Sequence, residues 1–273
     1  MNLKEVDLHI HTNCSDGEFS VDDTLKLAKE KGIKYIGIVD HDTIKQFEEL
    51  SKSQVAKDML EHGYRIFAGI EFSAKIDEKK LHLIGYGINY HRQEIKDIIK
   101  KNQELRKQKL EDRIEDLKKA NVNFTDKQLS YLRSIKNVGK PHIAKCMVEN
   151  GVDESVEIVI KKYLNNGDKL YRVEAKDIID AVHATGGFVV IAHPYQIATE
   201  NKISNEYAER IWKKLVDLGV NGMECYYSKY TIDEIKSLLN FATQNNLLIT
   251  MGSDFHGESV KPGLQIGQIF KKQ

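Results

Sequence analysis

The stretch DLHIHT at residues 7–12 decides how the rest of this chain can fold. In an extended strand alternate side chains share one face, so His9 and His11 would point one way while Leu8 and Ile10 pack the other way. One face of the strand would then present two imidazoles to a single cation. A lone histidine in a strand is ordinarily a packed core or surface residue, so the pattern has to recur before it indicates a metal site.

The pattern does recur, because further short apolar runs end in, or contain, residues that can bind a metal. Residues 39–42 read VDHD, residues 68–71 read AGIE, residues 189–194 read VVIAHP and residues 249–256 read ITMGSDFH. Together with an aspartate–glycine pair at 16–17 and a histidine inside the apolar run 81–87, they provide nine candidates: His9, His11, Asp16, His41, Glu71, His82, His193, Asp254 and His256. Chance is a poor explanation for a pattern that recurs this often.

All nine candidates carry an imidazole or a carboxylate, and none carries a thiolate. Such mixtures suit zinc, manganese or iron rather than magnesium or calcium. A catalytic zinc ordinarily has about three protein ligands and one open position, so the candidates exceed the needs of a single ion. The sequence therefore predicts about two to three divalent metal ions, of manganese, iron or zinc.

Strand and helix signals alternate over most of the chain. Strands are expected at 33–39, 65–72, 81–87, 188–192, 220–225 and 247–253, and helices at about 20–32, 43–63, 174–185, 207–218 and 231–245. Repeated strand–helix units indicate a parallel sheet covered by helices. The candidate ligands fall late in the strands or just after them, as reactive groups do in an α/β barrel, which favours a closed barrel over an open sheet.

Residues 91–172 interrupt this alternation. They carry charged helical patterns and no strand signal, with one long helix expected at 94–120 and shorter ones from about 125, 141 and 155. We expect a helical insertion or cap at 91–172, on a barrel domain formed by residues 1–90 and 173–273.

Composition excludes several classes of protein. Hydrophobic residues make up 41% and charged residues 30% of the 273 residues, as in an ordinary globular protein. Lysine plus arginine (41) balances aspartate plus glutamate (41), so no overall basic field would recruit nucleic acid or an acidic membrane. Without a leader or an apolar run of about 20 residues, we expect a cytoplasmic protein with no membrane contact and no obligate protein partner. Cys14, Cys146 and Cys225 form no C-x-x-C pair and predict no disulfide.

These motifs, in this order, resemble the PHP family, named for polymerase and histidinol phosphatase. Its motifs correspond here to residues 7–12, 39–42, 191–194 and 252–256, with Glu71 at the bridging glutamate and His82 at a further histidine. Within the family, residues 16–17, 69–71 and 140–144 resemble stand-alone metal-dependent phosphoesterases related to nucleoside 3′,5′-bisphosphate phosphatases and short-RNA 5′-exonucleases.

The resemblance implies a distorted (β/α)7 barrel with a trinuclear metal site. The first metal would be held by His9, His11, Glu71 and Asp254, the second by Asp16, His41 and His256, and the third by Glu71, His82 and His193. Asp16 replaces a histidine that some relatives have, and an oxygen ligand there favours manganese or iron over zinc. Asp40 and Asp42 are expected to orient His41 rather than to bind metal.

The predicted activity is hydrolysis of phosphate esters of nucleotide-like substrates by a metal-bound hydroxide, without a side-chain nucleophile. The substrate partner is thus a small phosphorylated molecule, a nucleotide or short oligonucleotide. Glu71, His193 and Asp254 would act through the metals, and the insertion offers Arg106, Arg113, Arg133 and Lys140 for phosphate binding. His142 would contact phosphate or protonate the leaving oxygen, or else only pack at a helix N-terminus.

Two other functions remain open at this point. Histidinol phosphatase uses the same metal chemistry and would differ in the insertion and in the residues around the site. A non-catalytic or proofreading-associated PHP module is a different class, but modules that have lost catalysis often lose ligands, whereas this chain retains all nine.

Overall fold

The computed structural model describes residues 2–135, 138–164 and 170–271. The chain forms two compact units, which we describe separately. The barrel unit comprises Met1–Ile99 and Val173–Gln273, and the helical unit comprises Lys100–Arg172. The whole helical unit falls within the insertion expected at 91–172.

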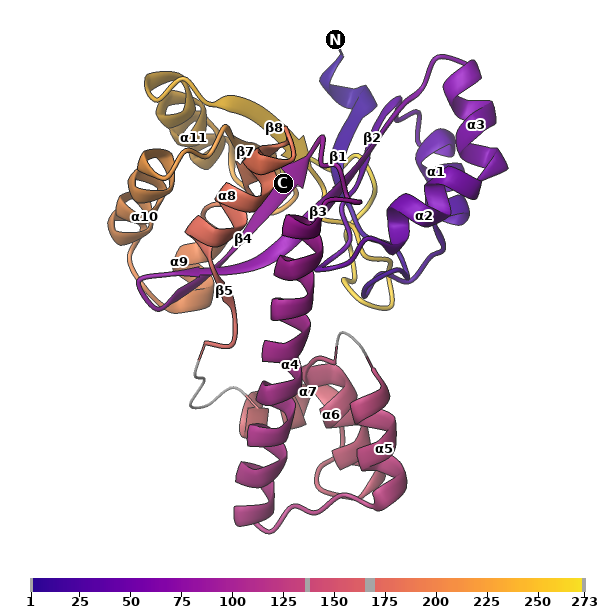
Figure 1. Ribbon diagram of the computed structural model, residues 1–273, viewed down its shortest axis with the longest axis vertical. Helices are drawn as coiled ribbons and strands as arrows, with labels where there is room; N and C mark the ends of the chain where they lie inside the picture. Colours follow the sequence, from indigo (N-terminus) through magenta and orange to yellow (C-terminus); the bar gives the residue numbers. More distant parts are fainter. Residues whose placement is uncertain (1, 136–137, 165–169, 272–273) are drawn as a thin grey trace. The chain divides into compact units, whose positions relative to one another are not determined.

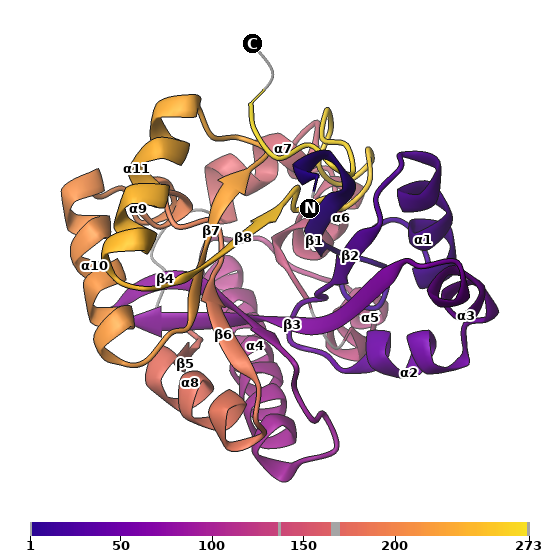
Figure 2. The same cartoon turned by 90° about the horizontal axis from the view of Figure 1, so that it is seen from above.

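A single mixed sheet builds the barrel unit (Figures 1 and 2). Its strands are β1 (Val6–Ile10), β2 (Tyr35–Ile38), β3 (Arg65–Ile76), β4 (Lys79–Tyr86), β5 (Val173–Glu174), β6 (Phe188–Ile191), β7 (Gly222–Tyr227) and β8 (Leu248–Gly252). They follow the order β1-β2-β3-β4-β6-β7-β8, and β5 pairs with β3 off this path. Parallel pairs lie on both sides of β4, which is antiparallel to β3 and β6.

The two ends of the sheet meet at β1. The backbone N–H of His11 donates to the carbonyl of Phe255 at 2.9 Å, and the N–H of Asp254 donates to the carbonyl of His9 at 2.8 Å. Ile10 and Phe255 form a parallel bridge just beyond β8. The sheet therefore curls into a nearly closed barrel, and the predicted distorted barrel is confirmed.

The distortion comes from the hairpin of β3 and β4, which is longer than the sequence predicted. Asp77 and Glu78 form its two-residue turn, with φ angles of +47° and +52°. Positive φ at both turn positions matches the right-handed twist of the flanking strands, so the turn reverses the chain without splaying them. The hairpin places an antiparallel strand where a simple alternation of strands and helices would have continued a parallel sheet.

Helices cover the outside of the barrel unit (Figure 2). They are α1 (Val21–Glu30), α2 (Lys45–Lys52), α3 (Gln54–Glu61), α8 (Ala175–Ala184), α9 (Gln196–Asn201), α10 (Asn205–Asp217) and α11 (Ile232–Gln244), with a short 3-10 helix at Leu3–Glu5. Leu25 and Ala28 of α1 and Met59 of α3 are buried against Ile36 and Ile38 of β2. Burying this apolar stripe against the sheet is what stabilises each helix.

The single helix expected at 43–63 is wrong, because the chain forms two helices there, α2 and α3. Ser53 separates them with φ −65° and ψ 121°, an extended conformation that no helix continues. Its hydroxyl accepts the N–H of Ala56 at 2.9 Å and donates to Asp22 on α1 at 2.5 Å. The two hydrogen bonds of Ser53, to the first turn of α3 and to α1, stabilise the fold more than continuing one helix through this position would.

The helix α4 (Gln93–Lys119) begins in the barrel unit and continues into the helical unit from Lys100. The helical unit then contains α5 (Asp126–Ser134), α6 (Lys140–Glu149), α7 (Val156–Val159) and a π-helical turn at Ile160–Leu164. It has its own buried apolar cluster, in which Leu117, Leu132, Met147 and Leu164 take part. Thr125 caps α5 through a capping box with Gln128. The unit thus has the core expected of an independently packed domain.

Candidate metal centre

The candidate ligands come from the strands of the barrel unit and from the segments that follow them. His9 lies in β1, Glu71 in β3 and His82 in β4. The others lie beyond strand ends: His11 and Asp16 after β1, His41 after β2, His193 after β6, and Asp254 and His256 after β8. Closure of the sheet brings residues from the N-terminal and C-terminal parts of the sequence together. In α/β barrels in general, the functional residues gather in this way at the C-terminal ends of the strands.

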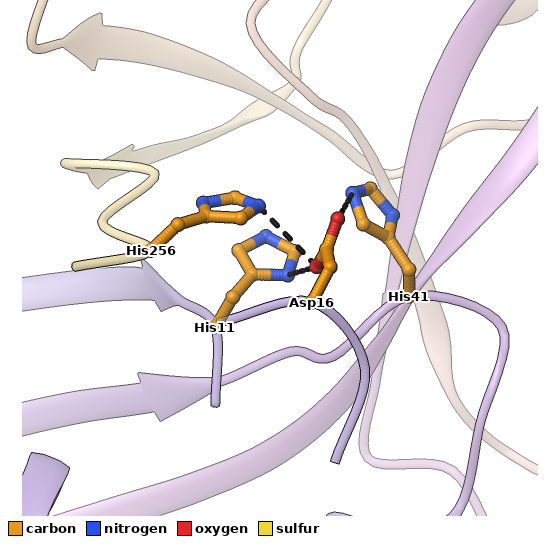
Figure 3. Close-up of side chains that lie close together, drawn as sticks. All are labelled: His11, Asp16, His41 and His256. Carbon is orange, nitrogen blue, oxygen red and sulfur yellow. Dashed lines mark ion pairs between the residues drawn. The ribbon is translucent and has the colours of Figure 1, made fainter. Parts of the chain in front are cut away.

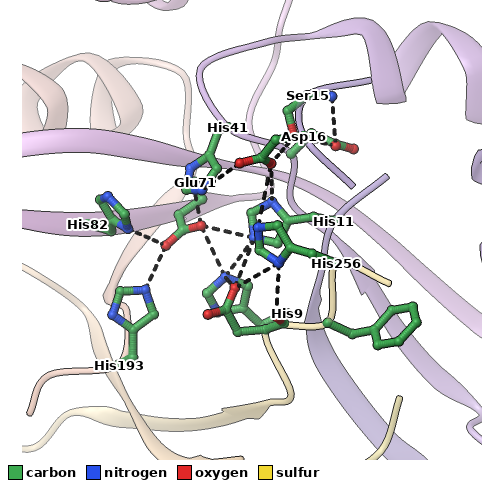
Figure 4. A network of polar contacts seen from close by, with 12 residues as sticks. His9, His11, Ser15, Asp16, His41, Glu71, His82, His193 and His256 are labelled. Atoms are coloured by element: carbon green, nitrogen blue, oxygen red, sulfur yellow. Dashed lines mark hydrogen bonds and ion pairs between the residues drawn. The ribbon is translucent and has the colours of Figure 1, made fainter. Parts of the chain in front are cut away.

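Glu71 lies at the middle of the cluster, and its two carboxylate oxygens face different histidines (Figure 4). Oε1 lies 2.9 Å from His82 Nδ1 and 2.9 Å from His193 Nε2. Oε2 lies 3.2 Å from His9 Nε2, 3.0 Å from His11 Nε2 and 3.3 Å from His41 Nδ1. One carboxylate thus lies between two sets of imidazoles, which is the arrangement that a bridging ligand requires.

Eight of the nine candidates fall into three overlapping groups whose ligand atoms lie within 4.8 Å of one another. The groups are His9, His11, Glu71 and Asp254; His11, Asp16, His41 and His256; and His41, Glu71 and His82. The first matches the expected ligands of the first metal. The second adds His11 to the expected set, and the third contains His41 where His193 was expected. His193 lies beside the third group through its contact with Glu71.

Asp16 lies between His41 and the rings of His11 and His256 in the second group (Figure 3). Its carboxylate lies 3.8 Å from His11 Nδ1, 3.9 Å from His41 Nε2 and 3.5 Å from His256 Nε2. Its side chain is 47% exposed, while that of His11 is fully buried. The second group therefore combines the buried imidazole of His11 with the solvent-accessible carboxylate of Asp16.

Several buried polar atoms of the cluster fit a bound cation. Among the described residues, Asp254 Oδ1 and His11 Nδ1 are buried without a hydrogen-bond partner. Buried polar atoms are ordinarily satisfied, and a buried charge ordinarily has a partner or coordinates a metal. A cation among these atoms would satisfy them, so the residues present fit divalent metal ions.

The pKa shifts differ among the candidate ligands. Burial, reinforced by His256 and His41, lowers the pKa of His11 well below its usual value, and burial lowers the pKa of His256 to about 4. Burial raises the pKa of Glu71, but the neighbouring imidazoles of His41 and His9 outweigh it and lower this pKa well below the usual value. Burial also acts on His9 and His193, but the carboxylates of Glu224 and Glu71 raise the pKa of His9 well above its usual value, and Glu71 raises that of His193. Metal binding requires neutral imidazole and ionised carboxylate, so an ion bound here would replace the protons of these two histidines.

Glu224 is a buried residue at this site that the sequence reasoning missed. Its Oε1 lies 2.9 Å from His9 Nδ1, and its Oε2 accepts the backbone N–H of His193 at 2.8 Å. A side chain at Gly252 would collide with His9 and approach Glu224 Oε1 at 2.8 Å, so the close packing requires glycine there. Glu224 thus holds His9 with Nε2 turned toward Glu71. The available signal was a glutamate inside the apolar strand predicted at 220–225.

Asp40 has a different role from the one expected, because it binds the loop that carries Asp16. Its carboxylate accepts the N–H and hydroxyl of Thr12 at 2.9 and 2.7 Å, and the N–H and hydroxyl of Ser15 at 3.1 and 2.7 Å. Burial raises the pKa of Asp40 to about 6 in spite of these donors. Asp42 accepts the N–H of Ser73 at 3.0 Å and so joins the end of β2 to β3.

The residues expected to bind substrate all lie in the helical unit. Arg106 and Arg113 are on α4, Lys140 and His142 are in the first turn of α6, and Arg133 is on α5. Arg133 forms a two-pronged ion pair with Glu111 at 2.7 and 2.8 Å. His142 Nδ1 accepts the N–H of Gly139 at 3.0 Å, which caps α6. Their substrate-binding role remains a prediction from the sequence.

Comparison with known proteins identifies the family. The family model described as PHP domain matches residues 7–224. The 5′-3′ exoribonuclease Rnm of Salmonella typhimurium is 27% identical over 96% of this chain and 88% of its own. A 3′,5′-nucleoside bisphosphate phosphatase of Chromobacterium violaceum is 22% identical over 93% of this chain and 88% of its own. A solved structure from Bifidobacterium adolescentis, assigned to the metal-dependent phosphoesterases, has a TM-score of 0.76 at 24% identity and covers 95% of this chain and 91% of its own.

Because the family model covers well over half of the chain, the protein belongs to the PHP domain family. The predicted family and the predicted class, a phosphoesterase, are confirmed by these comparisons. Within the part of the chain that the structure describes, no helix combines the length and the apolar character needed to cross a bilayer.

Proposed function

We propose that this protein is a metal-dependent phosphoesterase that hydrolyses phosphate esters of nucleotide-like substrates, namely nucleoside 3′,5′-bisphosphates or short 5′-phosphorylated oligonucleotides. The observation that carries the proposal is the position of Glu71, with each carboxylate oxygen facing a separate set of imidazoles at 2.9–3.3 Å. The relatives named above act on RNA and on nucleoside bisphosphates, which supports the substrate class.

The proposed centre holds two or three ions of manganese, iron or zinc, and its donors are nitrogen and oxygen. Bound there, the ions would lower the pKa of water and stabilise the negative charge that develops on phosphate oxygens. A thiolate contribution from Cys14, the nearest cysteine in sequence, is disfavoured because burial raises the pKa of this thiol to about 11. Oxygen donors from Asp16, Glu71 and Asp254 suit manganese and iron as well as zinc.

Side chains of the protein are proposed to position the substrate and to donate a proton. In the hydrolysis, the oxygen of water bonds to phosphorus while the bond from phosphorus to the leaving oxygen breaks, and the leaving oxygen takes up a proton. His142 is the proposed donor or phosphate contact, since acceptance of the Gly139 N–H by Nδ1 leaves the ring proton on Nε2. Arg106, Arg113, Arg133 and Lys140 are the proposed contacts of the non-reacting parts of the substrate.

A direct test is a substrate screen with purified protein reconstituted with manganese. Adenosine 3′,5′-bisphosphate, a 5′-phosphorylated RNA of a few nucleotides and histidinol phosphate should be compared at equal concentration. We expect phosphate or nucleotide release from one or both nucleotide substrates, loss of this activity with a chelator, and its recovery on addition of manganese. Preference for histidinol phosphate would replace the proposed substrate class, and no turnover of any substrate by metal-replete protein would contradict the enzymatic function.

A further inference from the structure

We propose that Lys261 binds the reacting phosphate at the open side of the metal centre. This inference deepens the proposed function and rests on it. Neither the sequence motifs nor the groups of candidate metal ligands include Lys261, which lies after His256 in the segment that follows β8.

Side-chain exposure identifies the open side of the cluster. The side chains of His9, His11 and Glu71 are at most 1% exposed, and that of Asp254 is 4% exposed. Asp16 is 47% exposed and Lys261 is 31% exposed. The side chains of His41 and His82 are 14% and 15% exposed, so Asp16 and Lys261 are the most exposed of these charged groups, and a phosphate from solvent can reach them.

The two oxygens of Asp254 show where the ammonium is placed. Oδ1 faces the interior, 3.5 Å from His11 Nε2 and 3.6 Å from His9 Nε2. Oδ2 faces the other way, where the hydroxyl of Tyr227 donates to it at 2.9 Å and Lys261 Nζ donates at 2.6 Å. Lys261 thus contacts the oxygen of Asp254 that does not face the histidines of the first group of candidate ligands.

The backbone that carries Lys261 is held by several hydrogen bonds. The N–H of Lys261 donates to the carbonyl of Gly257 at 2.9 Å, across a turn in which Gly257 has a φ of +98°. The N–H of Ser259 donates to Glu18 at 3.0 Å, and the N–H of Gly263 donates to Glu258 at 3.0 Å. An ordered turn therefore presents the side chain, which limits the entropy lost when it binds a ligand.

Charge also favours a phosphate at this position. Lysine side chains are protonated at neutral pH, and the ammonium of Lys261 lies 2.6 Å from Oδ2 of Asp254. An ammonium has three donors, and the contact with Asp254 occupies one of them. A partly exposed ammonium beside a carboxylate-rich cluster attracts a phosphate that the carboxylates alone would repel.

The alternative role for Lys261 is to position Asp254, and Tyr227 provides a matched control because it donates to the same oxygen without a charge. The variants are Lys261→Met, Lys261→Arg and Tyr227→Phe, each loaded with manganese. Binding of inorganic phosphate and binding of manganese are measured separately by titration calorimetry, and thermal unfolding checks that each variant is folded.

If Lys261 binds phosphate, Lys261→Met should weaken phosphate binding by roughly tenfold or more, since that is the scale of a hydrogen bond to a charged group. Its manganese affinity should be unchanged or higher, because a neighbouring positive charge has been removed. Lys261→Arg should restore most of the phosphate affinity. Tyr227→Phe should change manganese affinity more than phosphate affinity.

Equal phosphate affinity in the wild type and Lys261→Met would overturn the inference. So would a joint loss of manganese and phosphate binding in Lys261→Met that matches Tyr227→Phe, because this pattern marks a residue that only positions Asp254. Failure of the proposed function is distinguishable, since the manganese-loaded wild type would then neither bind phosphate nor hydrolyse any phosphate ester, and the inference would fail with it.

Discussion

Among the residues of the site, Glu71 has the most contacts with other candidate ligands. Its carboxylate is buried, and five imidazole nitrogens lie within 3.3 Å of its two oxygens. Removing one ligand that is shared between ions affects every site to which it contributes, whereas removing an unshared ligand affects one. Glu71 is therefore the residue at which a single substitution tests the whole centre.

We predict that Glu71→Gln, which removes the charge and retains the size, lowers turnover by at least about a hundredfold and lowers bound metal. The matched control is Glu78→Gln in the turn of the same β3–β4 hairpin, where the side chain is 72% exposed and paired with Lys75. Steady-state kinetics and elemental analysis of the purified proteins provide the comparison. Similar, mild losses in the two variants would mean that Glu71 is not shared between ions.

A second prediction concerns the cysteines, all of which are buried and free. Burial raises the pKa of Cys225 to about 12 and that of Cys14 to about 11, so their thiols stay protonated at pH 8. A thiol-specific disulfide reagent should label neither thiol in the folded protein at this pH, and should label both in guanidinium chloride. Because these folded pKa values are raised, their contribution to stability is present below the unfolded value and is lost as pH rises toward 11–12. Rapid labelling of Cys225 in folded protein would contradict its burial.

The candidate metal ligands could be predicted from the sequence, whereas the residues that contact those ligands could not. Histidines and carboxylates at the ends of apolar runs are a pattern visible along the chain, and the structure brings those side chains together. Glu224 was missed because its role depends on a contact with His9, more than 200 positions away in the sequence. Lys261 was missed because it contacts Asp254 from a turn that has neither strand nor helix periodicity. Such contacts leave no periodic signal in the sequence.

At the scale of elements, most strands and helices of the barrel unit follow from apolar periodicity and caps, and the departures occur where a local polar contact outweighs the pattern. Ser53 illustrates this, because α2 and α3 share one apolar pattern but are separated by a capping serine. The hairpin of β3 and β4 is a second case, in which the two-residue turn at Asp77 and Glu78 sets the direction of β4. Neither contact is visible in hydrophobic spacing.

We predict that Ser53→Ala lowers the free energy of unfolding by about 1–2 kcal/mol, because it removes the cap of α3 and leaves Asp22 without this donor. The control is Ser51→Ala, two residues earlier, where the hydroxyl donates to a carbonyl within the exposed part of α2. Urea unfolding of both variants measures the difference. Equal stability of the two would indicate that Ser53 is only a break between helices and that its hydrogen bonds contribute nothing net.

For the whole molecule, the candidate metal ligands lie in one unit, and the substrate contacts predicted from the sequence lie in the other. All nine candidate ligands belong to the barrel unit, and the helical unit has a buried core of its own. Metal ions can promote cleavage of many phosphate esters, so discrimination between substrates has to come from residues that hold the non-reacting parts. We propose that the helical unit, which is not needed to form the sheet, provides this discrimination.

This proposal leads to a prediction for Lys140, in the first turn of α6. Loss of a cation that binds a non-reacting phosphate should weaken substrate binding, whereas loss of a metal ligand should lower the chemical step. We therefore expect Lys140→Ala to raise KM for a nucleoside bisphosphate by about tenfold. KM for a small aryl phosphate and metal content should stay close to those of the wild type. Lys127→Ala on α5 serves as the matched control, since it removes an exposed lysine of the same unit.

Lys261 and Lys140 should differ in this assay, because Lys261 is proposed to bind the reacting phosphate, which both substrates have. Lys261→Met should raise KM for the bisphosphate and the aryl phosphate alike, while Lys140→Ala should affect the bisphosphate selectively. If Lys140→Ala and Lys127→Ala give the same KM for the bisphosphate, Lys140 does not hold substrate. If a folded variant that lacks residues 100–172 still ranks the two substrates as the wild type does, the helical unit is not the selector. Selectivity then has to be sought in the barrel unit around Asp16 and Lys261.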